Sequence, residues 1–214
     1  MATISDSSMI QPEGKVGGFT FYKLNGKIIM RSLPRGPHKN KTNPTALQKV
    51  YQNRLAEINA YLKPLKLVLN FGYQNFLGQK TGVNWAHTDL STKGYNHIAT
   101  PRINPAYLQI SRGSLVGAVE AKVIREVEGV RISWIDNSIE ANANPLDRVS
   151  VLLNHPEVKR HIWVKEVGER KDLSVLIPLS AKDQELEWEI YLVLHRPLNK
   201  KKILISDSQY LGRR

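Results

Sequence analysis

The 214-residue chain contains no cysteine, which excludes disulfides, thiolate metal sites and cysteine nucleophiles. Long apolar runs are also missing. The longest, Ile190-Tyr-Leu-Val-Leu194, has the length of a strand, whereas a membrane span needs about 20 apolar residues. The first ten residues lack the basic and apolar regions of a signal peptide. We therefore expect no membrane insertion, and a protein that is cytoplasmic or part of a particle assembled in the cytoplasm.

Acidic residues are scarce in the first half of the chain. Residues 1–110 hold 14 Lys/Arg and 4 Asp/Glu, whereas residues 111–214 hold 17 and 15. Between Gly14 and Lys66 the only acidic residue is Glu57. A field of one sign favours an anionic partner, such as nucleic acid, an acidic protein face or a lipid surface. The alternative is a solvated face that only keeps the protein soluble.

A β-hairpin is predicted over residues 19–31, after an extended arm of residues 1–18. Its turn is Asn25-Gly26, a pair that readily adopts the two positive φ angles of a type I′ turn. This turn predicts three cross-strand pairs: Leu24 with Lys27, Tyr22 with Ile29, and Phe21 with Met30.

Both faces of this hairpin carry apolar side chains: Phe19, Phe21, Ile28 and Met30 on one face, and Tyr22, Leu24 and Ile29 on the other. A hairpin on a protein surface normally has one wet face. We therefore expect both faces to be covered, either within the same domain or by a second molecule. The predicted assembly surface for a second molecule consists of Phe19, Phe21, Tyr22, Leu24, Ile29 and Met30.

Two to three helices are predicted after a basic connection, residues 31–41, that is interrupted by Pro and Gly. Asn43-Pro44 is expected to cap the first helix, which Pro64 ends. Shorter helices follow over residues 65–70 and 83–92, the last closed by Gly94. The first helix carries one apolar stripe, formed by Leu47, Val50, Tyr51, Leu55, Ile58, Tyr61 and Leu62.

From about Tyr107 the apolar pattern changes to alternation. Strong alternation covers residues 130–134, 149–153, 173–179 and 186–194, and weaker strands are predicted near 119–127, 162–164 and 202–205. About seven strands separated by turns are typical of an antiparallel, immunoglobulin-like sandwich. The positions of Trp134 and Trp188 resemble the fibronectin type III pattern. The predicted fold class is α+β, with an arm (1–18), a basic domain of hairpin and helices (19–106) and a β-sandwich domain (107–214).

No catalytic motif is found. The glycine-rich segment 13–18 precedes a hairpin rather than joining a strand to a helix, so it is not a phosphate loop. The six histidines show no ligand spacing. The acidic segment 136–140 with Asp147 lacks the calcium-loop consensus. We expect a protein that is not an enzyme, with no cofactor, no metal and no small-molecule substrate.

Two functions are compatible with these patterns. The first is a structural or assembly protein whose arm and hairpin dock onto a neighbouring subunit or an acidic partner, as a homo-oligomer or within a larger assembly. The second is nucleic-acid binding, in which basic groups contact phosphates and aromatic rings stack on bases, although no nucleic-acid fold signature is present. The predicted contact residues for either partner are Lys15, Lys23, Lys27, Arg31, Arg35, Lys39, Lys41, Lys49 and Arg54.

Several segments over nearly the whole chain match a known pattern: Gly14-Lys-Val-Gly17, Arg31-Ser-Leu-Pro34, Lys41-Thr-Asn-Pro-Thr-Ala-Leu-Gln48, Leu69-Asn-Phe-Gly72, Ser111-Arg-Gly-Ser-Leu115, Trp134-Ile-Asp136 and Ser208-Gln-Tyr210-Leu-Gly212. On these residues the chain resembles an uncharacterised bacterial family known only as a domain of unknown function. The chain departs from that pattern at residues 139–145 and at Arg213-Arg214. The resemblance implies no activity and no functional residue.

Overall fold

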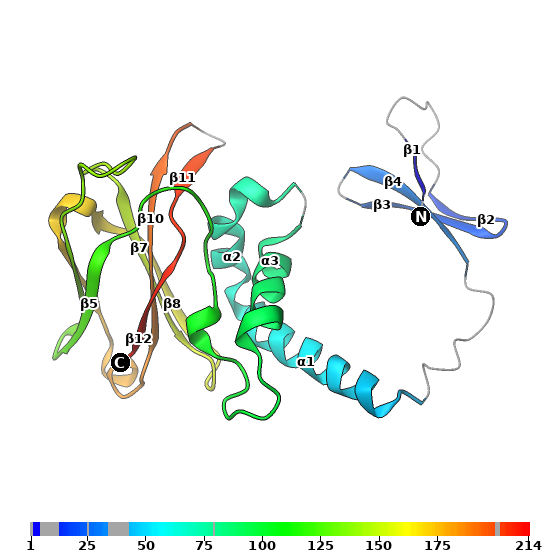
Figure 1. Ribbon diagram of the computed structural model, residues 1–214, viewed down its shortest axis with the longest axis horizontal. Coiled ribbons are helices and arrows are strands. Elements are labelled where there is room, and N and C mark those ends of the chain that lie inside the picture. Colours follow the sequence, from blue (N-terminus) through cyan, green and yellow to red (C-terminus); the bar gives the residue numbers. More distant parts are fainter. Residues whose placement is uncertain (1, 5–12, 25, 34–42, 79, 200–201) are drawn as a thin grey trace. The chain divides into compact units, whose positions relative to one another are not determined.

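The computed structural model describes residues 2–4, 13–24, 26–33, 43–78, 80–199 and 202–214. The chain forms two compact units, Met1–Val50 and Tyr51–Arg214 (Figure 1). The sequence predicts a division after residue 106, whereas the observed division lies at residue 50. The reason is that the helices share an apolar core with the strands that follow them.

The smaller unit is a four-stranded antiparallel sheet in the order β1-β4-β3-β2. β3 (Phe19–Leu24) and β4 (Lys27–Ser32) form the predicted hairpin, and all three predicted cross-strand pairs are observed. Gly26 has φ +79°, as a type I′ turn requires, while Asn25 lies outside the described residues. Two parts of the segment predicted as an extended arm are strands of this sheet. β1 (Ala2–Ile4) pairs with β4, and β2 (Gly14–Val16) pairs with β3.

The first helix, α1 (Ala46–Leu62), ends as predicted before Pro64, which lies in a 3₁₀ turn over Lys63–Leu65. Its cap is Thr45 rather than the predicted Asn43. The Thr45 hydroxyl accepts a hydrogen bond from the Gln48 N–H at 3.3 Å, and the Gln48 side chain accepts one from the Thr45 N–H at 2.9 Å. This reciprocal pair is a capping box, so the helix begins only at Ala46.

Two more helices confirm the rest of the helical prediction. α2 (Lys66–Gly72) follows the 3₁₀ turn, and α3 (Gly82–Asp89) continues into a π-helical turn over Leu90–Gly94. The Thr81 hydroxyl caps α3 by accepting a hydrogen bond from the Asn84 N–H at 3.2 Å. Single 3₁₀ turns lie at Gln74–Phe76 and Pro105–Tyr107.

Two antiparallel sheets form the rest of the larger unit. The outer sheet has the order β5-β6-β9, with β5 (Val119–Glu126), β6 (Gly129–Ile135) and β9 (Ser174–Pro178). The central sheet has the order β11-β10-β7-β8, and β12 also pairs with β10. Its strands are β7 (Arg148–His155), β8 (Arg160–Glu169), β10 (Glu189–Pro197), β11 (Ile203–Ile205) and β12 (Gln209–Arg213). A 3₁₀ turn (Arg170–Asp172) and α4 (Ala181–Gln184) lie in connections between strands.

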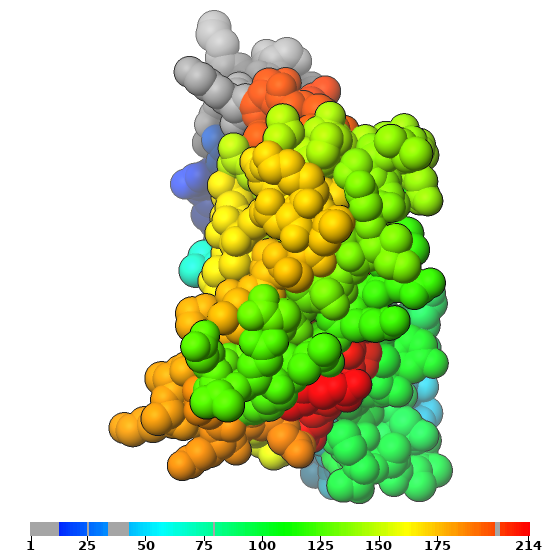
Figure 2. Space-filling view, turned by 90° about the vertical axis from the view of Figure 1, so that its left-hand side faces the viewer, coloured from blue at the N-terminus to red at the C-terminus, as the bar shows by residue number. Residues whose placement is uncertain are grey.

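All seven predicted strands are therefore present in two antiparallel sheets. β12 is an additional strand that the sequence did not indicate. β12 lies beside the chain that leads into β5, as the red and green surfaces of Figure 2 show. There the Gln209 amide accepts a hydrogen bond from the Ala118 N–H and donates one to its carbonyl, both at 2.8 Å.

Two apolar clusters hold the larger unit together. One lies between the two sheets and contains both predicted tryptophans, Trp134 and Trp188. The other joins the helices to the opposite face of the central sheet, where Leu62 and Tyr73 share a cluster with Tyr191. The larger unit thus has three layers, with helices, a central sheet and an outer sheet (Figure 1).

Candidate functional site

The small sheet has one face that is almost entirely apolar. Directly paired residues of an antiparallel sheet lie on the same side, and side chains alternate along each strand. The observed register therefore collects one set of side chains, here called the apolar face: Val16, Phe19, Phe21, Ile28 and Met30. The only cation on this side of β3 and β4 is Lys23, which stands opposite Ile28.

The other side of the sheet, here called the basic face, carries three predicted contact residues. Lys15, Lys27 and Arg31 are all exposed there. They surround Tyr22 and Ile29, which form a directly opposed pair. The structure thus brings three of the nine predicted cations together with the three remaining members of the assembly surface, Tyr22, Leu24 and Ile29. Arg35, Lys39 and Lys41 lie outside the described residues.

Neither face is fully covered within the described residues of the smaller unit. Ile28 is the only buried apolar side chain there, whereas Phe19 and Leu24 are 44% and 50% exposed. A sheet normally becomes stable by packing one face against another layer. Among the described residues the predicted assembly surface is therefore only partly covered, and Phe19 and Leu24 are its most exposed members.

The two predicted contact residues on α1 have different environments. Lys49 is exposed. Arg54 is partly buried, because its guanidinium donates a hydrogen bond to the Ser91 hydroxyl and lies 5.6 Å from the centre of the Tyr95 ring. Arg54 thus ties α1 to the turn after α3, and it is less free to reach a partner than the cations of the basic face.

The N-terminal half of α1 exposes part of its predicted apolar stripe. Leu47, Val50, Tyr51 and Leu55 are 64%, 46%, 58% and 50% exposed, whereas Ile58 is completely buried. The exposure of the stripe changes along the helix because neither apolar cluster contains a residue before Ile58. The exposed half of the stripe is a second uncovered apolar surface.

A cavity of about 430 Å³ opens in the larger unit, and no sequence motif indicated it. We call it the proline cavity, because Pro64, Pro101, Pro105 and Pro156 line it together with Tyr61. The lining comes from α1, the loop before β5, the turn after β7, and strands β10 and β12. Tertiary packing alone brings these segments together, so no local pattern could have revealed the cavity.

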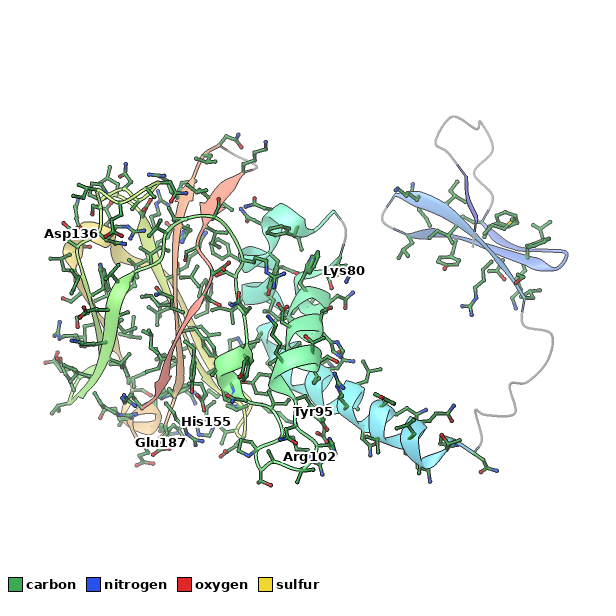
Figure 3. All side chains as sticks on the ribbon, in the orientation of Figure 1. Lys80, Tyr95, Arg102, Asp136, His155 and Glu187 are labelled. Atoms are coloured by element: carbon green, nitrogen blue, oxygen red, sulfur yellow. The ribbon has the colours of Figure 1, made fainter. Side chains whose placement is uncertain are left out.

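Three carboxylates gather around Arg213 at one side of the proline cavity. The Arg213 guanidinium lies 3.0 Å from Glu187, 3.8 Å from Glu157 and 4.0 Å from Glu189. Glu189 is buried and accepts a hydrogen bond from the Tyr210 hydroxyl. Glu187 itself is not part of the lining, and Lys159 lies in the same turn as Glu157, so the lining as a whole carries three acids (Glu57, Glu157 and Glu189) and three cations (Arg102, Lys159 and Arg213). Figure 3 shows Glu187 at the same end of the larger unit as Arg102, which lines the cavity.

The opposite rim of the proline cavity is balanced in charge. Glu57 accepts hydrogen bonds from Arg102 and from the Tyr95 hydroxyl, the latter at 2.8 Å. On the wall, burial raises the pKa of Tyr61 to about 12, so its hydroxyl is protonated at neutral pH. The cavity thus offers apolar walls, a neutral phenol and charged groups of both signs.

Ser150, His195 and Glu166 resemble a catalytic set, but Ser150 and His195 are buried. The Ser150 hydroxyl is 3.5 Å from His195 Nδ1, and His195 Nε2 is 3.5 Å from Glu166 Oε1. However, Ser150 and His195 are 0% and 1% exposed, and the Ser150 hydroxyl accepts the Glu166 N–H at 3.0 Å. The Phe71 ring packs edge-on to the imidazole, with the ring centres 5.1 Å apart. The contacts of this set are those of packed side chains.

In the acidic segment that was considered as a calcium site, the carboxylates contact other groups of the protein. Asp136 accepts hydrogen bonds from the N–H and hydroxyl of Ser138, at 3.0 and 2.6 Å. Asp147 is paired with Arg170. Across the described ranges, no three His, Asp or Glu side chains are grouped to hold a metal ion. In the same part of the chain, no helix combines the length and the apolar character that crossing a membrane demands.

Comparison with known proteins gives one match. The profile of a family of unknown function matches residues 12–212. No curated protein and no solved structure matches the chain.

Proposed function

The chain belongs to that family, DUF6266, which brings no assigned activity with it, and we propose that it is a non-enzymatic assembly protein. It docks through its N-terminal sheet onto a neighbouring subunit. The proposal is supported by exposed apolar surface rather than by a catalytic arrangement of side chains. It states that a neighbouring subunit covers the apolar face of the small sheet.

The observation that carries the proposal is the missing core of the small sheet. Among the described residues of that unit, only Ile28 is a buried apolar side chain. Val16 and Phe19 are about half exposed, at 59% and 44%. Covering both contributes roughly 1 kcal/mol each, about half of the value for complete burial of such side chains. A neighbouring subunit that packs on the apolar face supplies this gain together with the layer that the sheet lacks.

The charge of the sheet favours the same function. Lys15, Lys27 and Arg31 lie on the basic face, and only Lys23 lies on the apolar side. Docking by the apolar face therefore leaves most of the charge unburied, which avoids a large desolvation cost. The exposed cations are then free to steer the sheet toward an acidic surface.

Light scattering after size-exclusion chromatography tests this function. We expect the natively purified chain to form oligomers as its concentration rises, and the variant Phe19→Asp to remain monomeric. The matched control is Ile124→Asp, which alters a 58% exposed apolar residue of β5 and should assemble like the unmodified chain. A chain that is monomeric at every concentration, or a Phe19→Asp variant that assembles normally, would overturn the proposal.

A second candidate function is nucleic-acid binding, which the arrangement of Lys15, Lys27 and Arg31 around Tyr22 favours. Three phosphate contacts imply an affinity for duplex DNA that falls roughly 40-fold between 50 and 200 mM salt. Fluorescence anisotropy with a labelled duplex measures this slope. Replacing the three cations with Gln should abolish binding. An affinity that is insensitive to salt and to these changes contradicts this candidate.

A further inference from the structure

We propose that the proline cavity binds an uncharged small molecule whose apolar ring system carries an N–H or O–H donor. The rings lie against the prolines, and the donor reaches two buried side chains on the cavity wall, Asn154 and Glu189. This inference goes beyond the proposed function and does not depend on assembly, because every residue that carries it belongs to the larger unit.

The central sheet places these two polar side chains next to each other. Asn154 of β7 stands directly opposite Glu189 of β10, so both side chains leave the same face of the sheet. Side chains alternate along a strand, and this face therefore also carries Leu152 and Tyr191, which belong to the apolar cluster shared with the helices. Beyond that cluster, at the end of the two strands, an amide and a carboxylate line the cavity.

Both side chains are buried and have few hydrogen bonds. Asn154 and Glu189 are 4% and 5% exposed. One Glu189 oxygen accepts a hydrogen bond from the Tyr210 hydroxyl, whereas the other, Oε1, lies 4.0 Å from Arg213 Nε, which is beyond hydrogen-bonding distance. The Asn154 amide donates to the Tyr61 hydroxyl at 3.5 Å, which is longer than an ordinary hydrogen bond. Because buried polar groups normally have partners, this wall has capacity for a donor that enters the cavity.

The other walls favour an apolar ring system. Pro64, Pro101, Pro105 and Pro156 line the cavity, and their fixed φ angles limit the order that binding must create. The cavity volume of about 430 Å³ lies in the range of pockets that bind small molecules. A protein partner, by contrast, normally covers about 800 Å² of surface. The size of the cavity therefore favours a small molecule.

The charges of the lining favour a ligand without net charge. Three acids and three cations line the cavity, so their charges cancel. Arg102 already pairs with Glu57, and Arg213 already lies near Glu157. The third cation, Lys159, is exposed to solvent. An ionised ligand would have to compete with these contacts or give up its hydration against apolar walls, which is costly, whereas an uncharged ligand does neither.

A fluorescence titration of the full-length chain with N-phenyl-1-naphthylamine tests this inference. The probe is uncharged, joins two aromatic systems through an N–H, and emits strongly in apolar surroundings. We expect saturable binding of one probe per chain. The variant Ala60→Trp should lose this binding, because Ala60 lines the cavity and an indole at this position occupies it. The probe is excited at a wavelength that tryptophan does not absorb.

The matched control is Ala56→Trp. Ala56 is an exposed residue one turn earlier on α1 and is not part of the cavity lining, so this variant should bind the probe like the unmodified chain. It also detects any probe that binds the exposed apolar stripe of α1 instead of the cavity. Ala60 is exposed as well, and the urea midpoints of both variants should match that of the unmodified chain.

Two relatives of the probe test the class of ligand, with cavity binding measured as the part that Ala60→Trp removes. The hydrocarbon 1-phenylnaphthalene lacks the N–H and should bind about fivefold more weakly, which is the net value of one hydrogen bond. The anion 8-anilino-1-naphthalenesulfonate adds a charge to the same rings. It should bind the cavity about tenfold more weakly or less, because the sulfonate must lose its hydration there.

The outcomes distinguish this inference from the proposed function. The inference is overturned if the uncharged probe does not bind saturably, if Ala60→Trp binds it like the unmodified chain, or if Ala56→Trp loses it equally. Cavity binding that is tighter for the sulfonate, or unchanged without the N–H, overturns the proposed class of ligand. The variant Phe19→Asp, which should lose assembly, should bind the probe fully, so either proposal can fail while the other stands.

Discussion

Arg170 and Asp147 form an ion pair in which both side chains are completely buried, with 3.0 Å between Arg170 Nε and Asp147 Oδ2. The same guanidinium donates hydrogen bonds to the Asn137 side chain and to the carbonyls of Val116 and Gly117. One side chain thus joins the segment before β5, the loop before β7 and the connection between β8 and β9. Asp147, considered from sequence as a weak calcium ligand, serves this internal contact.

Removing the arginine should destabilise the larger unit strongly. Arg170→Met leaves a buried carboxylate and several acceptors without their main partner, so we expect a loss of about 3–5 kcal/mol in the free energy of unfolding. Urea denaturation measures the loss. Arg131→Met is the control, because Arg131 pairs with Glu126 at a 39% exposed position, where a pair contributes about 0–1 kcal/mol. Equal losses from both variants would contradict the role assigned to Arg170.

Gly72 permits a close approach between α2 and the chain near Ile110. A Cβ at Gly72 would lie 1.9 Å from the Ile110 carbonyl oxygen, so Gly72→Ala forces the backbones apart. We expect a loss of about 1–3 kcal/mol or more by urea denaturation. Gly78→Ala is the matched control, since nothing lies within 4 Å of its added Cβ, and it should change stability by less than about 0.5 kcal/mol. A neutral Gly72→Ala would show that this contact is loose.

The larger unit should fold without the small sheet. Neither apolar cluster contains a residue before Ile58, so a chain of residues 44–214, which keeps the Thr45 cap, retains every residue of both clusters. We expect the same urea midpoint as for the full chain, and loss of assembly in light scattering. A midpoint that falls markedly on truncation would show that the small sheet stabilises the larger unit.

Local chemistry explains which parts of the fold were predictable. Asn25-Gly26 determines a turn of two residues, so the register of Tyr22 with Ile29 followed directly from sequence. Pro64 lacks the N–H that an α-helix needs, so the end of α1 was predictable too. Alternating apolar residues identified the strands of both sheets, because one face of each strand must be buried.

Long-range packing determined what the sequence could not show. The stripe on α1 reads as continuous, yet only its C-terminal part meets the central sheet, so Leu47 and Leu55 stay exposed while Ile58 is buried. β12 escaped prediction because Gln209–Arg213 has no alternating apolar pattern and is held by pairing with β10. The proline cavity could not be predicted either, because Tyr61 and Arg213 come together only in the folded chain.

The stability of the larger unit should fall as the pH drops below about 6.5, because of His195. Burial lowers the pKa of this imidazole from 6.5, and the cations Lys165 and Arg148 act in the same direction, while Glu166 opposes them. The unfolded chain takes up the proton near pH 6.5, and the folded chain does so only at lower pH. Below pH 6.5 the unfolded state therefore binds more protons, and acid favours unfolding.

Urea midpoints at pH 7.5 and 5.5 measure this effect. The unmodified chain should lose stability between the two values, and His195→Gln should lose less, because the neutral amide does not titrate. Burial and the nearby Arg54 also lower the pKa of His87. The variant His87→Gln therefore measures how much His87 contributes to the loss of stability between these two pH values. The lowered pKa of Glu166 adds nothing in this window, because its contribution is complete above the unfolded value near 4.5 and is lost only at lower pH. A His195→Gln variant with the full pH dependence of the unmodified chain would show that the buried imidazole is not the group that acid titrates.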